Sequence, residues 1–117
     1  MPADFFMASR DYRGWESTRG CRVVRHLAGP RANGYWLVEV SPPVPPSVAG
    51  THDEVAQLVL AERHAGDNLS ALADKSVAVY VCIPVNEAAI GLGVIGEDDV
   101  RLVAWADVAR DPALLDR

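Results

Sequence analysis

The sequence contains only two cysteines and three histidines in 117 residues, and these shortages argue against several classes of function. Cys21 and Cys82 lack CxxC spacing, so neither a disulfide framework nor a zinc site is expected, and both thiols are expected to be buried and inert. No histidines show HxH or HExxH spacing, so no metal and no cofactor is predicted. No apolar run approaches the roughly 18 residues that span a bilayer, and the first residues lack the basic region of a signal peptide. We therefore expect a cytoplasmic protein.

Positive charge is also scarce. Eleven Lys and Arg residues stand against 16 Asp and Glu residues, which gives a net charge of -5 and a pI of about 5.0. Lys75 is the only lysine, and the ten arginines are scattered rather than clustered. Nucleic acid and anionic membranes are therefore not expected as partners. The preference for Arg, Ala, Val and Gly is typical of GC-rich genes and indicates a bacterial source.

The length and the 50% hydrophobic content predict a single domain with its own core. Residues 1–20 contain aromatic side chains without a clear period, so we expect a partly ordered N-terminal arm followed by one domain over residues 21–117. The β-prone runs 21–27 and 35–40 surround a Gly/Pro/Asn loop and predict a hairpin. Four prolines within residues 41–47 are expected to end the second strand.

The next segment has two interpretations. Thr51 and Glu54 have the spacing of a capping box, which predicts a helix over residues 55–64. The alternative is a strand, because Val55 and Val59 also tolerate an extended backbone.

The C-terminal half is expected to be mostly sheet. Residues 76–85 predict a central strand, and residues 88–95 and 100–105 predict a second hairpin with its tip at 96–99. Asp111-Pro112 predicts a short terminal helix. The expected fold is therefore α+β: a mostly antiparallel sheet of about five strands in the order β-β-α-β-β-β, with one main helix covering one face.

Gly91, Gly93 and Gly96 match the GxGxxG pattern of dinucleotide-binding proteins. Three carboxylates follow at once (Glu97, Asp98 and Asp99), where they would repel phosphate, and the chain that remains is too short for the rest of a βαβ unit. A glycine-bearing hairpin is therefore the favoured interpretation.

The candidate catalytic residues are Glu62, Arg63, His64 and Asp67. They combine carboxylates, a guanidinium and an imidazole at the end of an element and in the loop beyond it, where sites are often built. The alternative is that Arg63 and His64 only complement the dipole of a helix end. No residue is assigned a catalytic role by sequence alone, and an enzyme is less expected than a binding protein.

The candidate binding residues are Tyr35, Trp36, Trp105 and Asn68. The first three are aromatic residues of the kind that anchor interfaces when exposed, and Asn68 continues the polar cluster. The strand over 35–40 carries large apolar groups on both faces, so it needs cover from the N-terminal arm or from another protein. The first hypothesis is a non-catalytic acidic protein that binds a protein partner or forms a homo-oligomer, such as an immunity-type or accessory protein. The alternative is a small-molecule binder or small enzyme that uses the polar cluster around His64.

Overall fold

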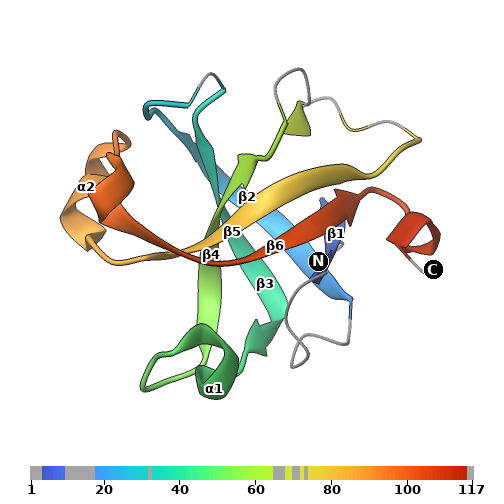
Figure 1. Ribbon diagram of the computed structural model, residues 1–117, viewed down its shortest axis with the longest axis horizontal. Helices are drawn as coiled ribbons and strands as arrows, with labels where there is room; N and C mark the ends of the chain where they lie inside the picture. Colours follow the sequence, from blue (N-terminus) through green and yellow to red (C-terminus); the bar gives the residue numbers. More distant parts are fainter. Residues whose placement is uncertain are drawn as a thin grey trace.

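The computed structural model describes residues 4–9, 18–31, 33–64, 68–69, 72 and 74–115, and these residues form a closed antiparallel β-barrel (Figure 1). Each strand pairs with the next one along the chain, and the first strand pairs with the last to close the ring. The strands are β1 (Phe5–Ser9), β2 (Arg19–Leu27), β3 (Tyr35–Val44), β4 (Val55–Glu62), β5 (Val77–Pro84) and β6 (Val100–Ala109). The helices are α1 (Pro46–Ala49) and α2 (Glu87–Leu92), with 3-10 turns η3 (Glu97–Asp99) and η4 (Pro112–Leu115).

The predicted α+β fold with one main helix is wrong. The segment expected to be that helix is β4, which pairs with β3 and β5. Its residues are buried on both faces of the barrel wall: Leu58 and Leu60 belong to the inner core, and Val59 and Ala61 to an outer apolar cluster. Burial on both faces produces a continuous apolar run, which a strand shares with a buried helix. The hydroxyl of Thr51 donates to the carbonyl of Asp53 (2.6 Å) and caps no helix.

The predicted second hairpin is also wrong, because α2 occupies most of its first strand. Asn86 Oδ1 accepts the backbone N–H of Ala89 (3.4 Å) at the start of α2, and Gly93 ends the helix with a φ of +81°. The expected tip forms η3. The first two glycines of the GxGxxG pattern therefore lie within and at the end of a helix, whereas the dinucleotide fingerprint requires them between a strand and a helix.

Other local predictions are confirmed. β2 and β3 form the expected hairpin, β5 and β6 are strands, and η4 begins at Pro112. β3 runs further than expected, to Val44, through a cis Ser41–Pro42 bond. Its pairing with β4 shifts between Glu39 and Val44, so the prolines there need not supply ladder donors to β4. Residues 5–9 of the expected N-terminal arm form β1, and residues 10–17 lie outside the described residues.

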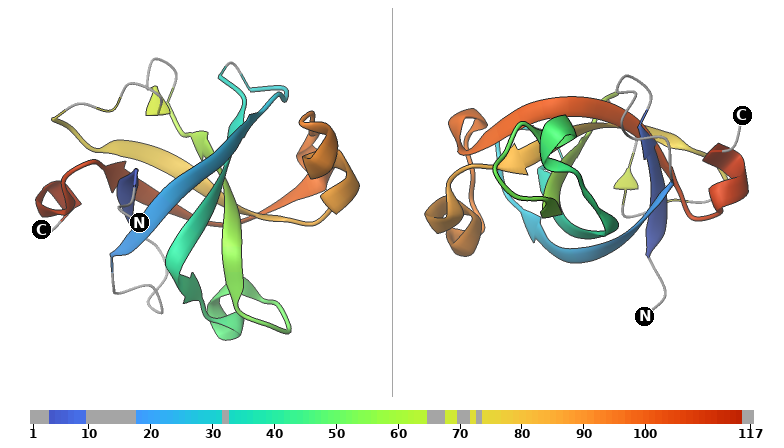
Figure 2. Two further views of the ribbon diagram at one scale, coloured as in Figure 1. Left: turned by 180° about the vertical axis from the view of Figure 1, so that it is seen from behind. Right: turned by 90° about the horizontal axis from the view of Figure 1, so that it is seen from below.

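The inner core is closed at both ends of the barrel by short segments of the chain. Figure 2 shows α1 lying across one end when the barrel is seen from below, and Ala49 of α1 packs against the inner core. At the other end, Leu69 and Leu72 belong to the same core. Among the side chains that are less than 2% exposed, the largest are Met7, Leu27, Leu58 and Leu60, followed by valines from β3, β4, β5 and β6.

A second apolar layer covers part of the outer wall. Tyr35 and Leu37 of β3 pack there with Ile95, and α2 contributes Ile90. The backbone of Ala28 holds this cover in place, because it donates to the carbonyl of Gly93 and accepts from Ile95 N–H, both at 2.8 Å. The outer face of β3, which needed cover, is therefore covered by the chain itself.

Candidate functional site

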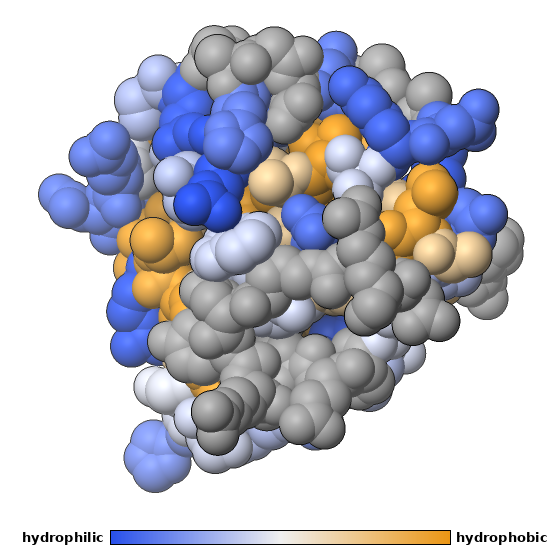
Figure 3. Space-filling view, turned by 45° about the vertical axis from the view of Figure 1, so that its right-hand side comes forward, coloured by the Kyte–Doolittle hydropathy of each residue, from blue (hydrophilic) through white to orange (hydrophobic). Residues whose placement is uncertain are grey.

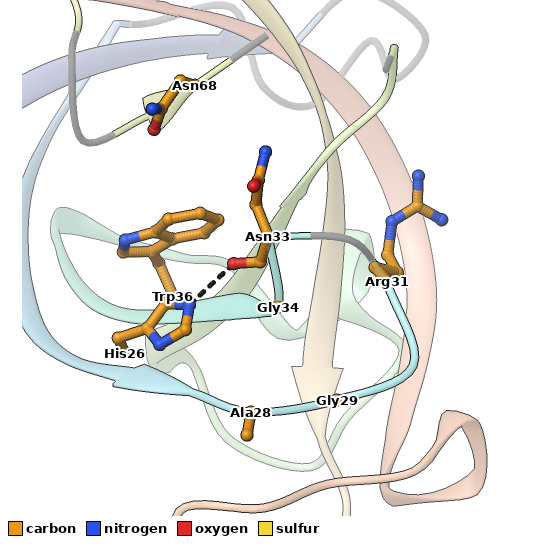
Figure 4. A pocket seen from close by; sticks show the side chains of 8 residues that line it. All are labelled: His26, Ala28, Gly29, Arg31, Asn33, Gly34, Trp36 and Asn68. Atoms are coloured by element: carbon orange, nitrogen blue, oxygen red, sulfur yellow. Dashed lines mark hydrogen bonds between the residues drawn. The ribbon is translucent and has the colours of Figure 1, made fainter. Parts of the chain in front are cut away.

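A hollow of about 590 Å³ opens at the end of the barrel where β2 ends and β3 begins (Figure 4). Its wall comes from both ends of the β2–β3 connection and from the segment that follows β4. We call this hollow the mouth pocket. Its lining residues are His26, Ala28, Gly29, Arg31, Asn33, Gly34, Trp36 and Asn68.

An imidazole and an indole form one side of the mouth pocket. His26 and Trp36 are cross-strand partners, and their rings meet edge to face with centroids 4.9 Å apart and planes at 68°. His26 Nε2 lies 2.6 Å from the carbonyl oxygen of Asn33. Because a carbonyl can only accept, Nε2 carries the hydrogen, and Nδ1 remains for other partners. Asn68 lies across the opening from Trp36 (Figure 4).

Glycine is required beside the imidazole. Gly34 has a φ of +69°, and a Cβ at this position would lie 2.8 Å from His26 Nε2 and 2.5 Å from the carbonyl oxygen of Leu27. Gly29 lies equally close to the ring of Tyr35, where a Cβ would overlap the ring edge. The Gly/Pro/Asn loop therefore fixes the position of His26 as well as turning the chain.

The candidate catalytic cluster does not come together. Glu62 is the last residue of β4 and is buried, and its Oε2 accepts the backbone N–H of Leu69 (2.8 Å). Arg63 lies on the outer face, with its guanidinium 4.5 Å from the centre of the Trp105 ring and 5.9 Å from that of Tyr80. Adjacent residues of an extended chain point to opposite sides, so the barrel wall separates these two groups.

The other candidates are dispersed. His64 is exposed beyond the end of β4, and Asp67 lies outside the described residues. Of the candidate binding residues, Trp36 and Asn68 meet in the mouth pocket. Tyr35 is buried in the outer apolar layer, and Trp105 is half-buried under Arg63.

Sequence reasoning missed most of the mouth pocket. His26 was not among the candidate residues, yet it faces Trp36 across the hairpin. A pairing signal was present in the sequence. If the hairpin places Leu27 opposite Tyr35, the residues before and after them, His26 and Trp36, must also be opposite.

The two cysteines are buried, as expected. Burial raises the pKa of Cys21 to about 12, with the charge of Arg19 opposing the shift. Burial also raises the pKa of Cys82 to about 11, and here the charge of Arg31 opposes it. Both side chains are therefore neutral thiols at physiological pH, in keeping with the prediction that they are unreactive. Within the part of the chain that the structure describes, no three His, Cys, Asp or Glu side chains group as metal ligands.

Comparison with known proteins finds no matching family model, no matching curated protein and no matching solved structure. Among the described residues, no helix has the length and hydropathy needed to cross a membrane.

Proposed function

We propose that this protein is a cytosolic, non-catalytic binding protein that takes a small planar molecule into the mouth of its barrel. The observation that carries the proposal is the mouth pocket, a hollow of about 590 Å³ with the His26–Trp36 pair on one side and Asn68 on the other. Pockets for small ligands commonly measure about 300–1,000 Å³ and lie in the mouths of barrels.

The lining favours a planar heterocycle that forms hydrogen bonds. The exposed imidazole offers most of the aromatic surface, because the Trp36 indole belongs to the inner core and is only 8% exposed. Aromatic pairs gain energy beyond the burial of area. Asn33 and Asn68 place amide groups, which donate and accept, at the rim of the same hollow. Arg31 adds a positive charge at one edge, so a neutral or anionic ring is a better ligand than a cationic one.

A binding role fits the positions of the polar groups better than a catalytic role. Glu62 is engaged by the backbone of Leu69, and Arg63 is stacked on the other side of the wall. A general base and its partner need to lie within hydrogen-bonding reach of one reacting atom. The alternative of an enzyme built on the cluster around His64 therefore has little geometric support.

Binding of a protein partner remains a second candidate, supported by a different observation. Large apolar side chains are exposed around the end of α2: Leu92 is 80% exposed and Val94 is 63% exposed. Exposed apolar side chains that lie close together are a feature of interaction surfaces. On the face shown in Figure 3, apolar areas are separated by hydrophilic side chains. An immunity-type or accessory partner would dock around α2 rather than on Tyr35, which is covered.

Titration by NMR tests the first candidate. Nicotinamide, uracil and indole serve as probes, and the reporters are the indole N–H of Trp36 and the ring signals of His26. We expect at least one probe to give saturable shifts of these signals. His26→Ala and Asn68→Ala should weaken its binding about tenfold, whereas His64→Ala, which alters an exposed histidine outside the mouth pocket, should leave it unchanged.

Two results would overturn the proposal. One is that none of the probes shifts the Trp36 and His26 signals saturably at millimolar concentration. The other is that His64→Ala weakens binding as much as His26→Ala does. Light scattering of the wild type and of Leu92→Ser tests the self-associating form of the second candidate. If copies of the protein associate through the surface at α2, the measured molar mass should be lower for the variant than for the wild type.

A further inference from the structure

A second hollow, of about 370 Å³, lies on the outer wall of the barrel and combines an apolar floor with both signs of charge. We call it the outer groove. Its floor is formed by Ala61, Cys82, Val100 and Leu102, which come from three adjacent strands. Leu102 is 59% exposed, so the floor offers apolar surface to a ligand.

Arg31 supplies a fixed positive charge at one edge of the outer groove. Its Nη2 donates to the backbone carbonyl of Glu62 (2.7 Å), and its guanidinium carbon lies 5.1 Å from the centre of the Tyr80 ring. The hydrogen bond uses one of the five N–H donors of the guanidinium. Arg63 approaches the same Tyr80 ring at 5.9 Å, so two guanidiniums share one aromatic side chain in a protein whose net charge is -5. The guanidinium of Arg31, which lines the groove, is suited to pair with a carboxylate.

Glu97 supplies the opposite charge. It is the first residue of η3, it is exposed, and it lines the same groove. Arg31 and Glu97 do not form an ion pair with each other, although both residues are among those described. Both charges act on the phenol of Tyr35: burial raises its pKa, the charge of Arg31 opposes that shift, and Glu97 adds to it. The two charges therefore both lie near the Tyr35 side chain within the groove, as the two charges on one carbon atom of an amino acid require.

We propose that the outer groove binds an apolar α-amino acid as its zwitterion. The carboxylate pairs with Arg31, the ammonium group pairs with Glu97, and the aliphatic side chain covers Cys82, Val100 and Leu102. A ligand with only one charge would leave the other groove charge without a partner, which lowers its affinity relative to the zwitterion. This site is separate from the mouth pocket, although Arg31 contributes to both.

Matched ligands separate the two charge contacts. L-leucine carries both charges, 4-methylpentanoate lacks the ammonium group, and leucinamide lacks the carboxylate. We expect L-leucine to shift the backbone amide signals of residues 96–102 saturably at millimolar concentration, and each analogue to bind about tenfold more weakly. The proposal is overturned if L-leucine gives no saturable shift, or if 4-methylpentanoate binds as well as leucine.

Variants then assign the contacts to residues. Glu97 lines the outer groove and is not among the residues of the mouth pocket. Glu97→Gln should weaken the binding of leucine about tenfold and leave the binding of 4-methylpentanoate unchanged. Arg31→Leu should weaken both ligands, and Arg31→Lys should restore part of the loss, which separates lost charge from lost structure. His26→Ala should leave leucine binding unchanged, so failure of the mouth pocket and failure of the outer groove are distinguishable. Equal leucine affinity in the wild type and Glu97→Gln would refute the zwitterion assignment.

Discussion

Glu62 and Arg63 are adjacent in the sequence, yet they lie on opposite faces of the barrel wall. The carboxylate of Glu62 accepts the backbone N–H of Leu69 inside the barrel, whereas the guanidinium of Arg63 stacks over Trp105 outside it. Each residue therefore joins a different part of the structure. Glu62 fixes the segment that carries Leu69 into the end of the inner core, and Arg63 covers an aromatic ring on β6.

Removing the acceptor at Glu62 should destabilise the protein. In Glu62→Ala the buried N–H of Leu69 loses its acceptor, and an unsatisfied buried donor costs about 1–3 kcal/mol. Glu62→Gln keeps a carbonyl oxygen at nearly the same place and should cost about 1 kcal/mol or less. Urea denaturation measures both values. Equal losses in the two variants would show that the hydrogen bond to Leu69 N–H contributes little.

Two glycines with nearly equal φ angles provide a matched test of steric crowding. Gly34 has a φ of +69° and Gly50 a φ of +70°, so alanine is strained at both positions. A Cβ at Gly50 meets only the end of the Arg101 side chain at 3.6 Å, whereas a Cβ at Gly34 meets His26 and the carbonyl of Leu27. We expect Gly50→Ala to cost about 1 kcal/mol and Gly34→Ala about 2–4 kcal/mol.

The crowding at Gly34 also predicts a functional readout. Gly34→Ala should displace the His26 ring from the carbonyl of Asn33 and weaken probe binding in the mouth pocket. Gly50→Ala should leave that binding unchanged. If thermal denaturation gives the same loss of stability for both alanine variants, the crowding around Gly34 is relieved by small shifts and the prediction is wrong.

Local features of the sequence were sufficient for the hairpin of β2 and β3, for β5 and for the turn at Pro112. They could not reveal the closure of the barrel, because β1 pairs with β6 through partners such as Met7 and Val108, which are far apart in the sequence. Such nonlocal pairing leaves no periodic signal in either strand. An open sheet with a covering helix was predicted because the pairing of β1 with β6 could not be seen in the sequence.

The helix α2 and the mouth pocket were predictable in part. Asn86 and Gly93 are typical start and stop residues of a helix, but the alternative of a glycine-rich hairpin was preferred for this segment. The side chains of Glu62 and Arg63, grouped in the candidate cluster, lie apart for a physical reason. Their grouping assumed a helix end, whereas an extended backbone sends neighbouring side chains to opposite faces.

Stability should fall at alkaline pH because of the two buried thiols. Burial raises the pKa of Cys21 to about 12 and that of Cys82 to about 11, while in the unfolded chain both return to a value near 9. Above about pH 9 the unfolded state therefore releases protons that the folded state retains, and the free energy of unfolding falls with pH. Each thiol contributes a slope of up to about 1.4 kcal/mol per pH unit.

A double variant isolates this effect. Cys21→Ala with Cys82→Ala should be less stable than the wild type at pH 7, because buried volume is lost, but its stability should fall less steeply between pH 9 and pH 11. Iodoacetamide at pH 8 should modify the native wild type slowly and the urea-unfolded protein fully. Rapid labelling of the native protein, or equal slopes in the two proteins, would contradict the assignment of raised pKa values.

Arg25 should hold the outer cover of the barrel in place, and Arg22 on the same strand is its control. Arg25 Nη1 donates to the carbonyl of Gly91 (3.1 Å) and lies near that of Ile90 (3.4 Å), at the C-terminal end of α2, where the helix dipole favours a positive charge. Among the described residues, Arg22 forms an ion pair with Glu39 on the barrel surface, where both side chains are almost half exposed. Exposed pairs of this kind contribute little.

We expect Arg25→Ala to lower the free energy of unfolding by about 0.5–1 kcal/mol and Arg22→Ala by about 0.5 kcal/mol or less. Hydrogen exchange is the sharper measurement, because a local opening of α2 need not unfold the barrel. The amides of Ile90 and Gly93, which donate to the carbonyls of Asn86 and Ala89, should exchange faster in Arg25→Ala and at the wild-type rate in Arg22→Ala. Unchanged exchange at both amides would mean that the apolar contacts of Ile90 hold α2 without the arginine, and that Arg25 serves only as an exposed charge.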